Sequence, residues 1–415
     1  MFALAILPVV GFVGAAVDYS RANSIKASLQ ASLDATGLAM AKLAPTLTQG
    51  ELQTRATAYF TAQFNKADAK NLTITSNFTT TGGSQLTLTA AASMDTAFMK
   101  IMGYSSLNVG SSSTVKWGNN RLRVALALDN TGSMASDGKM TALKSATKNL
   151  LDQLRAAATT NGDVYVSIVP FSKDVNAGSG NYSASWINWS AWDAAHMTCN
   201  GWVNNGTCYS WSGPISFTPA NHNTWNGCVT DRDKDYDITG SDPTSTLGTK
   251  FVAEEYGNCP LAAKGLSFDW TSMKSMVDQM YSAGSTNQTI GLVWAWMSLT
   301  GGGPFTVPAK DPNYQYQQTI MLMSDGLNTQ NRWDGNGSAV STAVDTRMAL
   351  ACTNAKAAGI TIYTVHVNTN GDPTSQILKN CASSPSNFFT VTSSGQINTV
   401  FNQIGTQLSQ LRISR

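Results

Sequence analysis

The sequence predicts an α/β fold in which residues 119–415 form a doubly wound, mostly parallel sheet. Apolar runs that end at polar residues alternate with segments of helical periodicity, as is typical of βαβ units. The expected strands are 122–128, 164–171, 319–323, 360–367 and 387–391, and the clearest helices are 139–157, 343–358 and 397–411. Gly359 closes one of these helices directly before a strand. Two apolar runs end at an acid, Asp129 and Asp325, and such sheets bind ligands beyond the carboxyl ends of their strands.

A long segment of different composition interrupts this domain at about 173–270. Its aromatic and sulfur-containing residues include Trp186, Trp189, Trp192, Trp202, Trp211, Trp225, Cys199, Cys208, Cys228 and Cys259. Since helical periodicity is weak here, we expect a disulfide-stapled subdomain near the carboxyl edge of the sheet. The tryptophans are consistent with two roles: filling a helix-poor core, or forming a surface that binds a partner.

Length and composition limit the number of domains and the kinds of partner to be expected. A chain of 415 residues allows about two or three domains, each with a full core. Charged residues make up only 13%, against about 25% in an average globular domain. The net charge of +2 gives no electrostatic reason to expect a nucleic-acid partner.

The six cysteines show no C-x-x-C pair, so the spacing of a zinc site is absent. An even number of cysteines behind an export-like N-terminus indicates disulfides. Cys352 lies in the helix at 343–358 and Cys381 lies beyond the strand at 360–367. The simplest pairing joins these two and leaves two bridges inside the insertion, although Cys352 could also be a free, buried apolar residue.

The N-terminus carries no charge before Asp18, and about 17 apolar residues are the lower limit for a bilayer span. A cleaved signal peptide is the alternative, but no basic region precedes the run. An apolar stripe continues beyond it at helical spacing: Ile25, Leu29, Leu33, Thr36, Met40 and Leu43. We therefore predict one helix over 1–44 that leaves the membrane and becomes amphipathic.

Residues 45–118 predict a small α+β domain that is pilin-like in outline. A helix is expected at 49–64, followed by strands at 72–75 and 85–89, in which apolar residues alternate with polar ones. A turn at 81–84, a short helix at 96–103 and a final strand at 111–117 complete this unit.

The turn that follows the strand at 122–128 reads D-x-T-x-S. It places Asp129, Thr131 and Ser133 so that one carboxylate and two hydroxyls converge, and these oxygens suit a hard cation such as Mg²⁺. The run resembles the first segment of the metal-ion-dependent adhesion site of von Willebrand factor A domains, with Thr131 in place of the usual Ser. That resemblance implies that Thr286, in a loop before a helix, and Asp325 complete a site for Mg²⁺ or Mn²⁺. The alternative is that both acids are ordinary helix caps or turn residues.

A weaker metal pattern lies inside the insertion. Asp231, Asp233, Asp235 and Asp237 alternate as the acids of calcium loops do, so Asp231, Asp233 and Asp235 are candidates for a second, Ca²⁺ site. The Gly and the closing Glu of an EF-hand are missing at their offsets.

The chain as a whole resembles TadG-like proteins of the Flp/Tad (tight-adherence) pilus system. The segments that carry the resemblance are 3–8, 17–21, 29–41, 128–134, 228–233, 291–296 and 322–326. It implies a bacterial envelope protein that is anchored in the inner membrane, with a periplasmic or surface-exposed A-type domain. Such a protein assembles or anchors thin adhesive pili, and its partners are pilus-assembly or envelope proteins that offer a carboxylate to the metal.

The sequence does not favour an enzyme. His196 and His222 fall in the insertion and His366 in an expected strand, without a G-x-S-x-G elbow or an H-E-x-x-H helix. Two alternatives to the metal-dependent binding protein remain: an envelope scaffold without metal, and a hydrolase whose site lies in the insertion.

Overall fold

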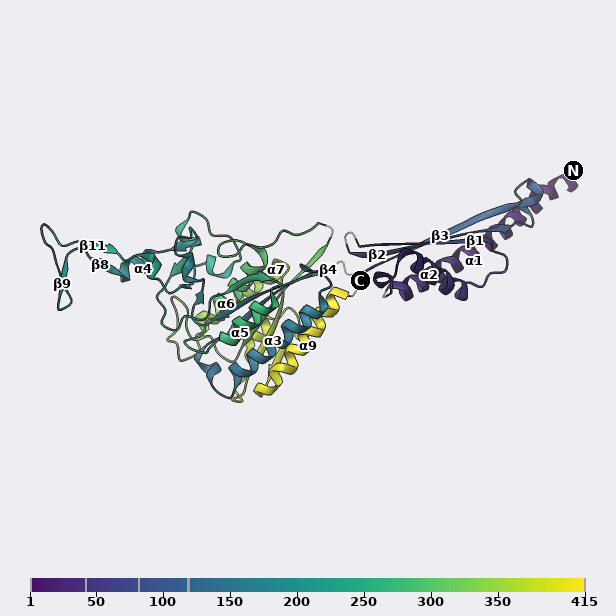
Figure 1. The fold of residues 1–415 in the computed structure, drawn as a ribbon. Coiled ribbons are helices and arrows are strands. Elements are labelled where there is room, and N and C mark those ends of the chain that lie inside the picture. Colours follow the sequence, from purple (N-terminus) through teal and green to yellow (C-terminus); the bar gives the residue numbers. More distant parts are fainter. Residues whose placement is uncertain (1, 42, 81–82, 118–119, 313, 414–415) are drawn as a thin grey trace. The chain divides into compact units, whose positions relative to one another are not determined.

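The computed structural model describes the backbone of residues 2–41, 43–80, 83–117, 120–312 and 314–413, and the side chains of 12–41, 43–80, 83–117, 120–312 and 314–411. The chain divides into two compact units (Figure 1). The first holds residues 1–120, 311–315 and 413–415, and the second holds residues 121–310 and 316–412. Part of the turn predicted at 81–84, and the side chains of 1–11 in the predicted membrane segment, lie outside the described residues.

The first unit packs two helices against an antiparallel sheet. Its elements are α1 (Phe2–Ala41), α2 (Gln49–Gln63), β1 (Lys70–Thr79), β2 (Ser84–Asp95) and β3 (Ser106–Trp117), with the strand order β1-β2-β3. Alternate residues of β2 are buried, including Leu86, Leu88 and Ala90. This period of two gives the sheet one apolar face, which α1 covers.

Helix α1 confirms the predicted amphipathic stripe as far as Met40. The buried members are Ile25, Leu29, Leu33, Thr36 and Met40, whereas Leu43 lies beyond the helix and is exposed. Gly37 lets the helix lie close to the sheet, because a Cβ at this position would be 2.7 Å from Cγ2 of Val115. Among the residues that the structure describes, no helix has the length and apolar composition needed to cross a bilayer. The short helix expected at 96–103 is a single 3-10 turn, Met99–Met102.

Asp18 ties α1 to the turn between β2 and β3. Its side chain is buried and accepts hydrogen bonds from three backbone N–H groups, those of Ala97 at 2.9 Å, Phe98 at 2.9 Å and Met99 at 2.8 Å. We expect Asp18→Ala to destabilise this unit by about 2–4 kcal/mol, because it leaves buried donors without acceptors. Hydrogen exchange of these three amides should accelerate. Asp34→Ala is the matched control: Asp34 is exposed on the same helix, and equal effects of the two substitutions would contradict the assignment.

The second unit contains the predicted sheet. Its six principal strands are β4 (Asn120–Asp129), β5 (Val164–Phe171), β14 (Lys264–Ser267), β15 (Gln315–Ser324), β16 (Thr361–Val367) and β17 (Phe388–Val391). They lie in the order β14-β5-β4-β15-β16-β17. Numbered along the chain, this is 3-2-1-4-5-6, the doubly wound order. The pairs β4/β5, β15/β16 and β16/β17 are parallel and β14 is antiparallel to β5, so the prediction of a mostly parallel sheet is confirmed.

Helices cover both faces of this sheet. On one face lie α3 (Lys139–Ala157), α5 (Trp270–Gln279) and α9 (Ser394–Ile413), and on the other lie α6 (Gln288–Thr300), α7 (Thr342–Ala357) and α8 (Gln376–Cys381). Strand β4 serves both cores, because Ala125 and Ala127 pack into one and Val124, Leu126 and Leu128 into the other. A strand buried on both sides has to be apolar throughout, which explains why its sequence shows a continuous run rather than alternation.

The insertion adds short elements, which extend the main sheet and form two separate two-stranded sheets. Its elements are α4 (Ser190–Ala195), β6 (Val175–Asn176), β7 (Ile187–Asn188), β8 (Met197–Cys199), β9 (Trp202–Asn204), β10 (Thr207–Tyr209), β11 (Phe217–Pro219), β12 (Cys228–Thr230) and β13 (Phe251–Ala253). Four of them, β6, β12, β13 and β7, continue the main sheet beyond β5, and the separate sheets are β10-β9 and β11-β8. The predicted insertion at 173–270 includes β14, the antiparallel strand of the doubly wound order. Four half-buried residues give that strand no detectable period.

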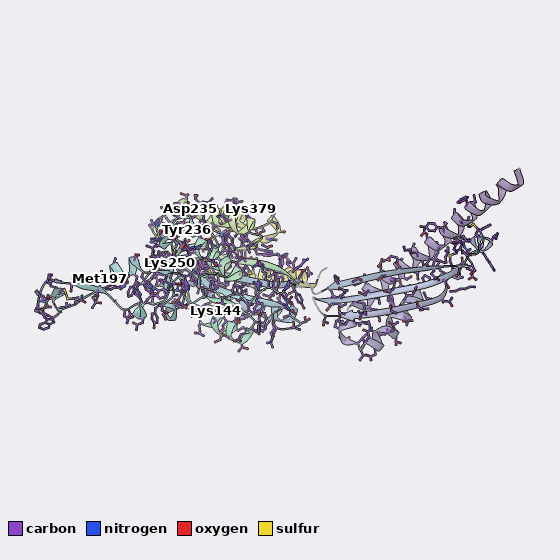
Figure 2. The ribbon with its side chains drawn as sticks, turned by 90° about the horizontal axis from the view of Figure 1, so that it is seen from above. Lys144, Met197, Asp235, Tyr236, Lys250 and Lys379 are labelled. Atoms are coloured by element: carbon purple, nitrogen blue, oxygen red, sulfur yellow. A yellow bond between two sulfur atoms is a disulfide. The ribbon has the colours of Figure 1, made fainter. Side chains whose placement is uncertain are left out.

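The tryptophans of the insertion differ in burial. Trp192 and Trp225 are buried, and Trp189 packs edge-on against both, with ring centroids 5.5 and 5.2 Å away. Trp202 and Trp211 are 39% and 80% exposed. They belong to β9, β10 and the loop that follows, in a part that projects from the unit (Figure 1; Met197, at its base, is labelled in Figure 2). Within the described residues, this projection from 197 to 219 contributes nothing to the apolar cores.

All six cysteines form disulfides, and the predicted pairing of Cys352 with Cys381 is confirmed. Cys352 and Cys381 join α7 to α8, while the other bridges, Cys199–Cys208 and Cys228–Cys259, lie inside the insertion. The Cys199–Cys208 bridge staples the projecting hairpins to each other, and Cys228–Cys259 holds β12 against the loop before β14.

Candidate metal centre

The two strand-end acids meet where the direction of winding changes. Asp129 is the last residue of β4, and Asp325 directly follows β15, the neighbour of β4 in the sheet. Strands beyond β4 continue toward β5 and β14, whereas those beyond β15 continue toward β16 and β17. This is the topological switch point, where loops on the two sides separate and leave room for a ligand.

Four of the five predicted ligands form one hydrogen-bonded cluster. The Ser133 hydroxyl donates to Oδ1 of Asp325 at 2.6 Å and lies 3.0 Å from Oγ1 of Thr131. Oδ1 of Asp129 accepts from the backbone N–H of Thr131 at 2.8 Å. Asp129 and Thr131 are buried, and Ser133 is exposed, so the cluster runs from the core to the surface.

Backbone hydrogen bonds connect the loop that carries Thr286 to the turn after β4. The N–H of Gly132 donates to the carbonyl of Gly284 at 2.9 Å, and the N–H of Ala283 donates to the carbonyl of Asn130 at 2.7 Å. Gly284 has a φ of +87°, and a Cβ there would lie 2.4 Å from the Tyr256 hydroxyl, so this approach requires glycine.

Thr286, two residues further on, is held mainly by its backbone. Its N–H donates to Oγ1 of Thr329 at 2.9 Å, and its carbonyl accepts from the N–H of Thr329 at 2.9 Å. Its side chain is mostly buried. In the part of the chain that the structure describes, its hydroxyl makes no hydrogen bond to the other four predicted ligands. The loop of Thr286 therefore lies beside the cluster, but among the described residues the Thr286 side chain is not hydrogen-bonded to the other predicted ligands.

Two further polar residues, neither of them predicted from the sequence, orient the carboxylate of Asp129. Ser324 contacts it directly, and Gln288 acts through Ser324. The Ser324 hydroxyl donates to Oδ2 of Asp129 at 2.6 Å, and the side-chain amide of Gln288 donates to that hydroxyl at 3.0 Å and to the carbonyl of Gly326 at 2.9 Å. All three side chains, those of Asp129, Ser324 and Gln288, are fully buried. Ser324 immediately precedes the strand-end acid, so its position was an available signal. The role of Gln288 depends on how α6 packs, which the sequence does not reveal.

Lys139 is the third residue that was missed. It begins α3, and its ammonium lies 2.6 Å from Oδ2 of Asp325. The two side chains are only 2% and 0% exposed. A lysine in the first turn of a helix is unfavourable next to the positive end of the helix dipole. That mismatch, a few residues after the D-x-T-x-S turn, was the signal in the sequence.

The electrostatics of the cluster are those of two acids close together in the protein interior. Burial, and after it the negative charge of Asp325, raises the pKa of Asp129 to about 7. Burial lowers the pKa of His366, although the charges of Asp325 and Asp372 oppose this effect. His366 pairs in register with Ser324 on the adjacent strand, so a neutral imidazole lies beside the site.

The donor set suits a hard divalent cation. Its oxygens come from two carboxylates and from hydroxyls, the groups that Mg²⁺ and Mn²⁺ accept, and it offers no sulfur or imidazole ligand that would favour a softer metal. Among the residues that the structure describes, no three or more His, Cys, Asp or Glu side chains gather to hold a metal. With only two acids, Asp129 and Asp325, the hydroxyls of Thr131 and Ser133 and water would have to supply the remaining ligands.

The acids proposed for calcium are engaged in other contacts. Arg332 donates to Asp233 at 2.7 Å, and Arg347 donates to Asp235 at 3.0 Å. Asp231 is buried and accepts from the side-chain amide of Asn287 at 2.9 Å. Because Asn287 follows Thr286 directly, this acidic segment supports the loop of the candidate metal centre. A Ca²⁺ site at Asp231, Asp233 and Asp235 stays a prediction.

Comparison with protein families gives a match at the N-terminus. Residues 1–42 match the family model described as "Putative Flp pilus-assembly TadE/G-like", which confirms the predicted resemblance for this segment. No curated protein matches the chain significantly.

Solved structures give distant likenesses. The pilus adhesin SpaC from Lactobacillus rhamnosus GG aligns at 12% identity and a TM-score of 0.40 over 84% of this chain and 36% of that chain, so the chain spans about a third of SpaC. The vWF domain of the type V pili tip protein Mfa5 from Porphyromonas gingivalis aligns at 11% identity and a TM-score of 0.41, over 71% of this chain and 97% of that one. Proximal thread matrix protein 1 from the mussel byssus, with a zinc-occupied MIDAS motif, aligns at 13% identity and a TM-score of 0.33, over 69% of this chain and 47% of that one.

Proposed function

We propose that this protein is an assembly or anchoring component of Flp/Tad pili, and that its second unit is a von Willebrand factor A-type domain that binds a partner protein through a divalent cation. The match of residues 1–42 supports the first statement. The second depends on one observation: Ser133, from the turn after β4, donates to Asp325 at the end of β15, which is the meeting of strand ends that such a metal site requires.

In this proposal, Asp129, Thr131, Ser133, Thr286 and Asp325 hold Mg²⁺ or Mn²⁺, directly or through water. The bound ion would offer an open position to a carboxylate of the partner. The protein's own contribution is to orient the oxygens in advance. Ser324, itself fixed by Gln288, holds Oδ2 of Asp129, so the carboxylate keeps one orientation.

The cellular location is part of the same proposal. The N-terminal helix would anchor the chain in the inner membrane, with the second unit in the periplasm or at the cell surface. The uncharged run before Asp18 and the TadE/G-like match favour an anchor. Three disulfides favour an oxidising compartment for the second unit.

The test is genetic replacement in the bacterium that carries this gene. Asp129→Ala, expressed at the normal level, should reduce piliation or adherence as severely as a deletion does. It should also abolish chelator-sensitive capture of envelope proteins by the purified chain. Asp152→Ala is the matched control, because Asp152 is an exposed acid on α3, away from the cluster. Normal adherence with Asp129→Ala, together with loss in the deletion strain, would instead support a scaffold that needs no metal.

A non-enzymatic role is also proposed. The histidines of the insertion lie among tryptophans: His222 stacks on Trp189 with centroids 3.7 Å apart and contacts Asp193 at 2.7 Å. His196 stacks on Trp192. These contacts account for both rings as packing partners. Hydrolysis of model esters or peptides that disappears in His222→Ala would instead favour the hydrolase.

Metal binding should depend on pH with a definite sign. The folded protein holds a proton on Asp129 up to about pH 7, far above the ordinary carboxyl pKa, so this proton stabilises the fold at low pH and the benefit is lost as the pH rises through 7. Since the cation binds the carboxylate form, its affinity should fall by up to about tenfold per pH unit below 7 and level off above. Calorimetric Mg²⁺ titrations at pH 5.5, 6.5, 7.5 and 8.5 check this. An affinity that is constant from pH 5.5 to 7.5 would contradict it.

A further inference from the structure

Lys139 lies in an unusual position for a lysine. Its side chain is 2% exposed, whereas lysines are almost never fully buried without a partner. The partner is Asp325, one of the two acids of the candidate metal centre, at 2.6 Å. The chain itself therefore places a cationic group beside the proposed metal position.

Both oxygens of Asp325 are engaged by groups of the protein. Oδ1 accepts from the Ser133 hydroxyl at 2.6 Å, and Oδ2 accepts from the Lys139 ammonium at 2.6 Å. A divalent cation that approached Asp325 would meet a positive charge at hydrogen-bond distance from the same carboxylate. Like charges that close to each other in a protein interior, where water screens them little, repel strongly. The ammonium and a divalent cation therefore compete for the charge of this carboxylate.

We propose that Lys139 is the resident counter-cation of the site, and that it must release Asp325 before this carboxylate can hold a divalent metal. This inference rests on the proposed function, whose metal it concerns. Lys139 thereby sets the threshold of metal concentration at which the site becomes able to bind a partner. It is a residue that determines affinity, not a ligand.

The chain provides a route for the displaced side chain. Lys139 begins α3, directly after two residues in the left-handed region, Asp137 with a φ of +55° and Gly138 with a φ of +69°. Asp137 is exposed and accepts hydrogen bonds from the hydroxyls of Ser136 and Thr369. A swing of the flexible four-carbon stem toward this turn would expose the ammonium beside a new carboxylate. Metal binding would then change the side-chain conformation at the start of α3.

Calorimetry on the full chain tests the competition. Lys139→Met keeps the length and apolar volume of the stem but removes the charge, so it should bind Mg²⁺ and Mn²⁺ at least about tenfold more tightly than the unchanged protein. Lys139→Arg, which retains the charge, is the matched control and should show no gain. If Lys139→Met fails to fold, as judged by its thermal transition, Lys139→Gln takes its place.

Amine labelling provides a second readout that does not need a variant. Lys139 should resist acylation in the presence of chelator and become at least about tenfold more reactive with saturating Mg²⁺, because its side chain would leave a buried site. Lys379, which is exposed and labelled in Figure 2, should react equally in both conditions. Asp129→Ala should eliminate the Mg²⁺ effect.

The outcomes separate this inference from the proposed function. Mg²⁺ binding of equal strength in the unchanged protein and in Lys139→Met, with unaltered labelling, would overturn the role of Lys139 and leave the metal centre intact. Absence of Mg²⁺ and Mn²⁺ binding in both proteins would refute the metal centre itself, and the inference with it. Binding that appears only in Lys139→Met would support the inference and show that the resident cation prevails in the natural sequence.

Discussion

Asp129→Ala should lower the affinity of the protein for Mg²⁺ by about a hundredfold or more while the second unit remains folded. Asp129 is one of only two carboxylates in the candidate centre, and it is the one that Ser324 and the backbone of Thr131 orient. Loss of a first-sphere carboxylate removes both a ligand and half of the negative charge that attracts the cation.

The fold should tolerate this change. Burial raises the pKa of Asp129, which means that the folded protein disfavours its charged form near neutral pH. Removing the acid therefore relieves one unfavourable contribution, even though the Ser324 hydroxyl loses its acceptor. Calorimetric titration and thermal unfolding, each compared with Asp152→Ala, provide the measurement. Unchanged affinity, or a thermal transition lowered by more than about 10 °C, would contradict the assignment of Asp129 as a ligand that the fold does not require.

A large effect on stability is expected from the Cys352–Cys381 bridge. It closes a loop of 29 residues that contains all of β16, and both cysteines, one in α7 and one in α8, are buried. In the chain-entropy model, replacing both by alanine should destabilise the second unit by about 3–4 kcal/mol. The measurement is the free energy of unfolding from urea titration of the full chain.

The control for this prediction is the bridge in the projecting hairpins. Cys199 and Cys208 are nine residues apart, in a segment that, within the described residues, contributes to none of the apolar cores. Replacing both by alanine should loosen the hairpins locally without a comparable change in global unfolding. Similar losses for the two pairs would show that the projection is part of the cooperative unit.

The main sheet was predictable because its strands are buried on both faces. The apolar runs before Asp129 and before Asp325 are continuous, as expected of strands that are buried on both faces. These runs therefore indicated both the strands and the polar residues at their ends. Strand β14 was not predictable, since four half-buried residues carry no periodic signal. The burial of each tryptophan in the insertion was equally unpredictable, because it depends on contacts between segments that are distant in the sequence.

In the candidate site too, some features could be predicted from the sequence and others could not. Asp129, Thr131 and Ser133 lie in one turn, so their convergence follows from local sequence. Lys139 and Gln288 act through contacts with residues far along the chain, with Asp325 and with Ser324 respectively. Such contacts depend on how α3 and α6 pack on the sheet. A single sequence therefore indicates the ligands of a strand-end site more readily than the residues that orient or oppose them.

The central claim is that the ends of β4 and β15 form a divalent-cation site. Anomalous diffraction from crystals of the protein soaked in Mn²⁺ tests it most directly. The account predicts one strong peak among the oxygens of Asp129, Ser133 and Asp325, with the ammonium of Lys139 moved away from Asp325. A peak only at the acids of the 231–237 segment, or no peak in crystals of both the natural sequence and Lys139→Met, would contradict it.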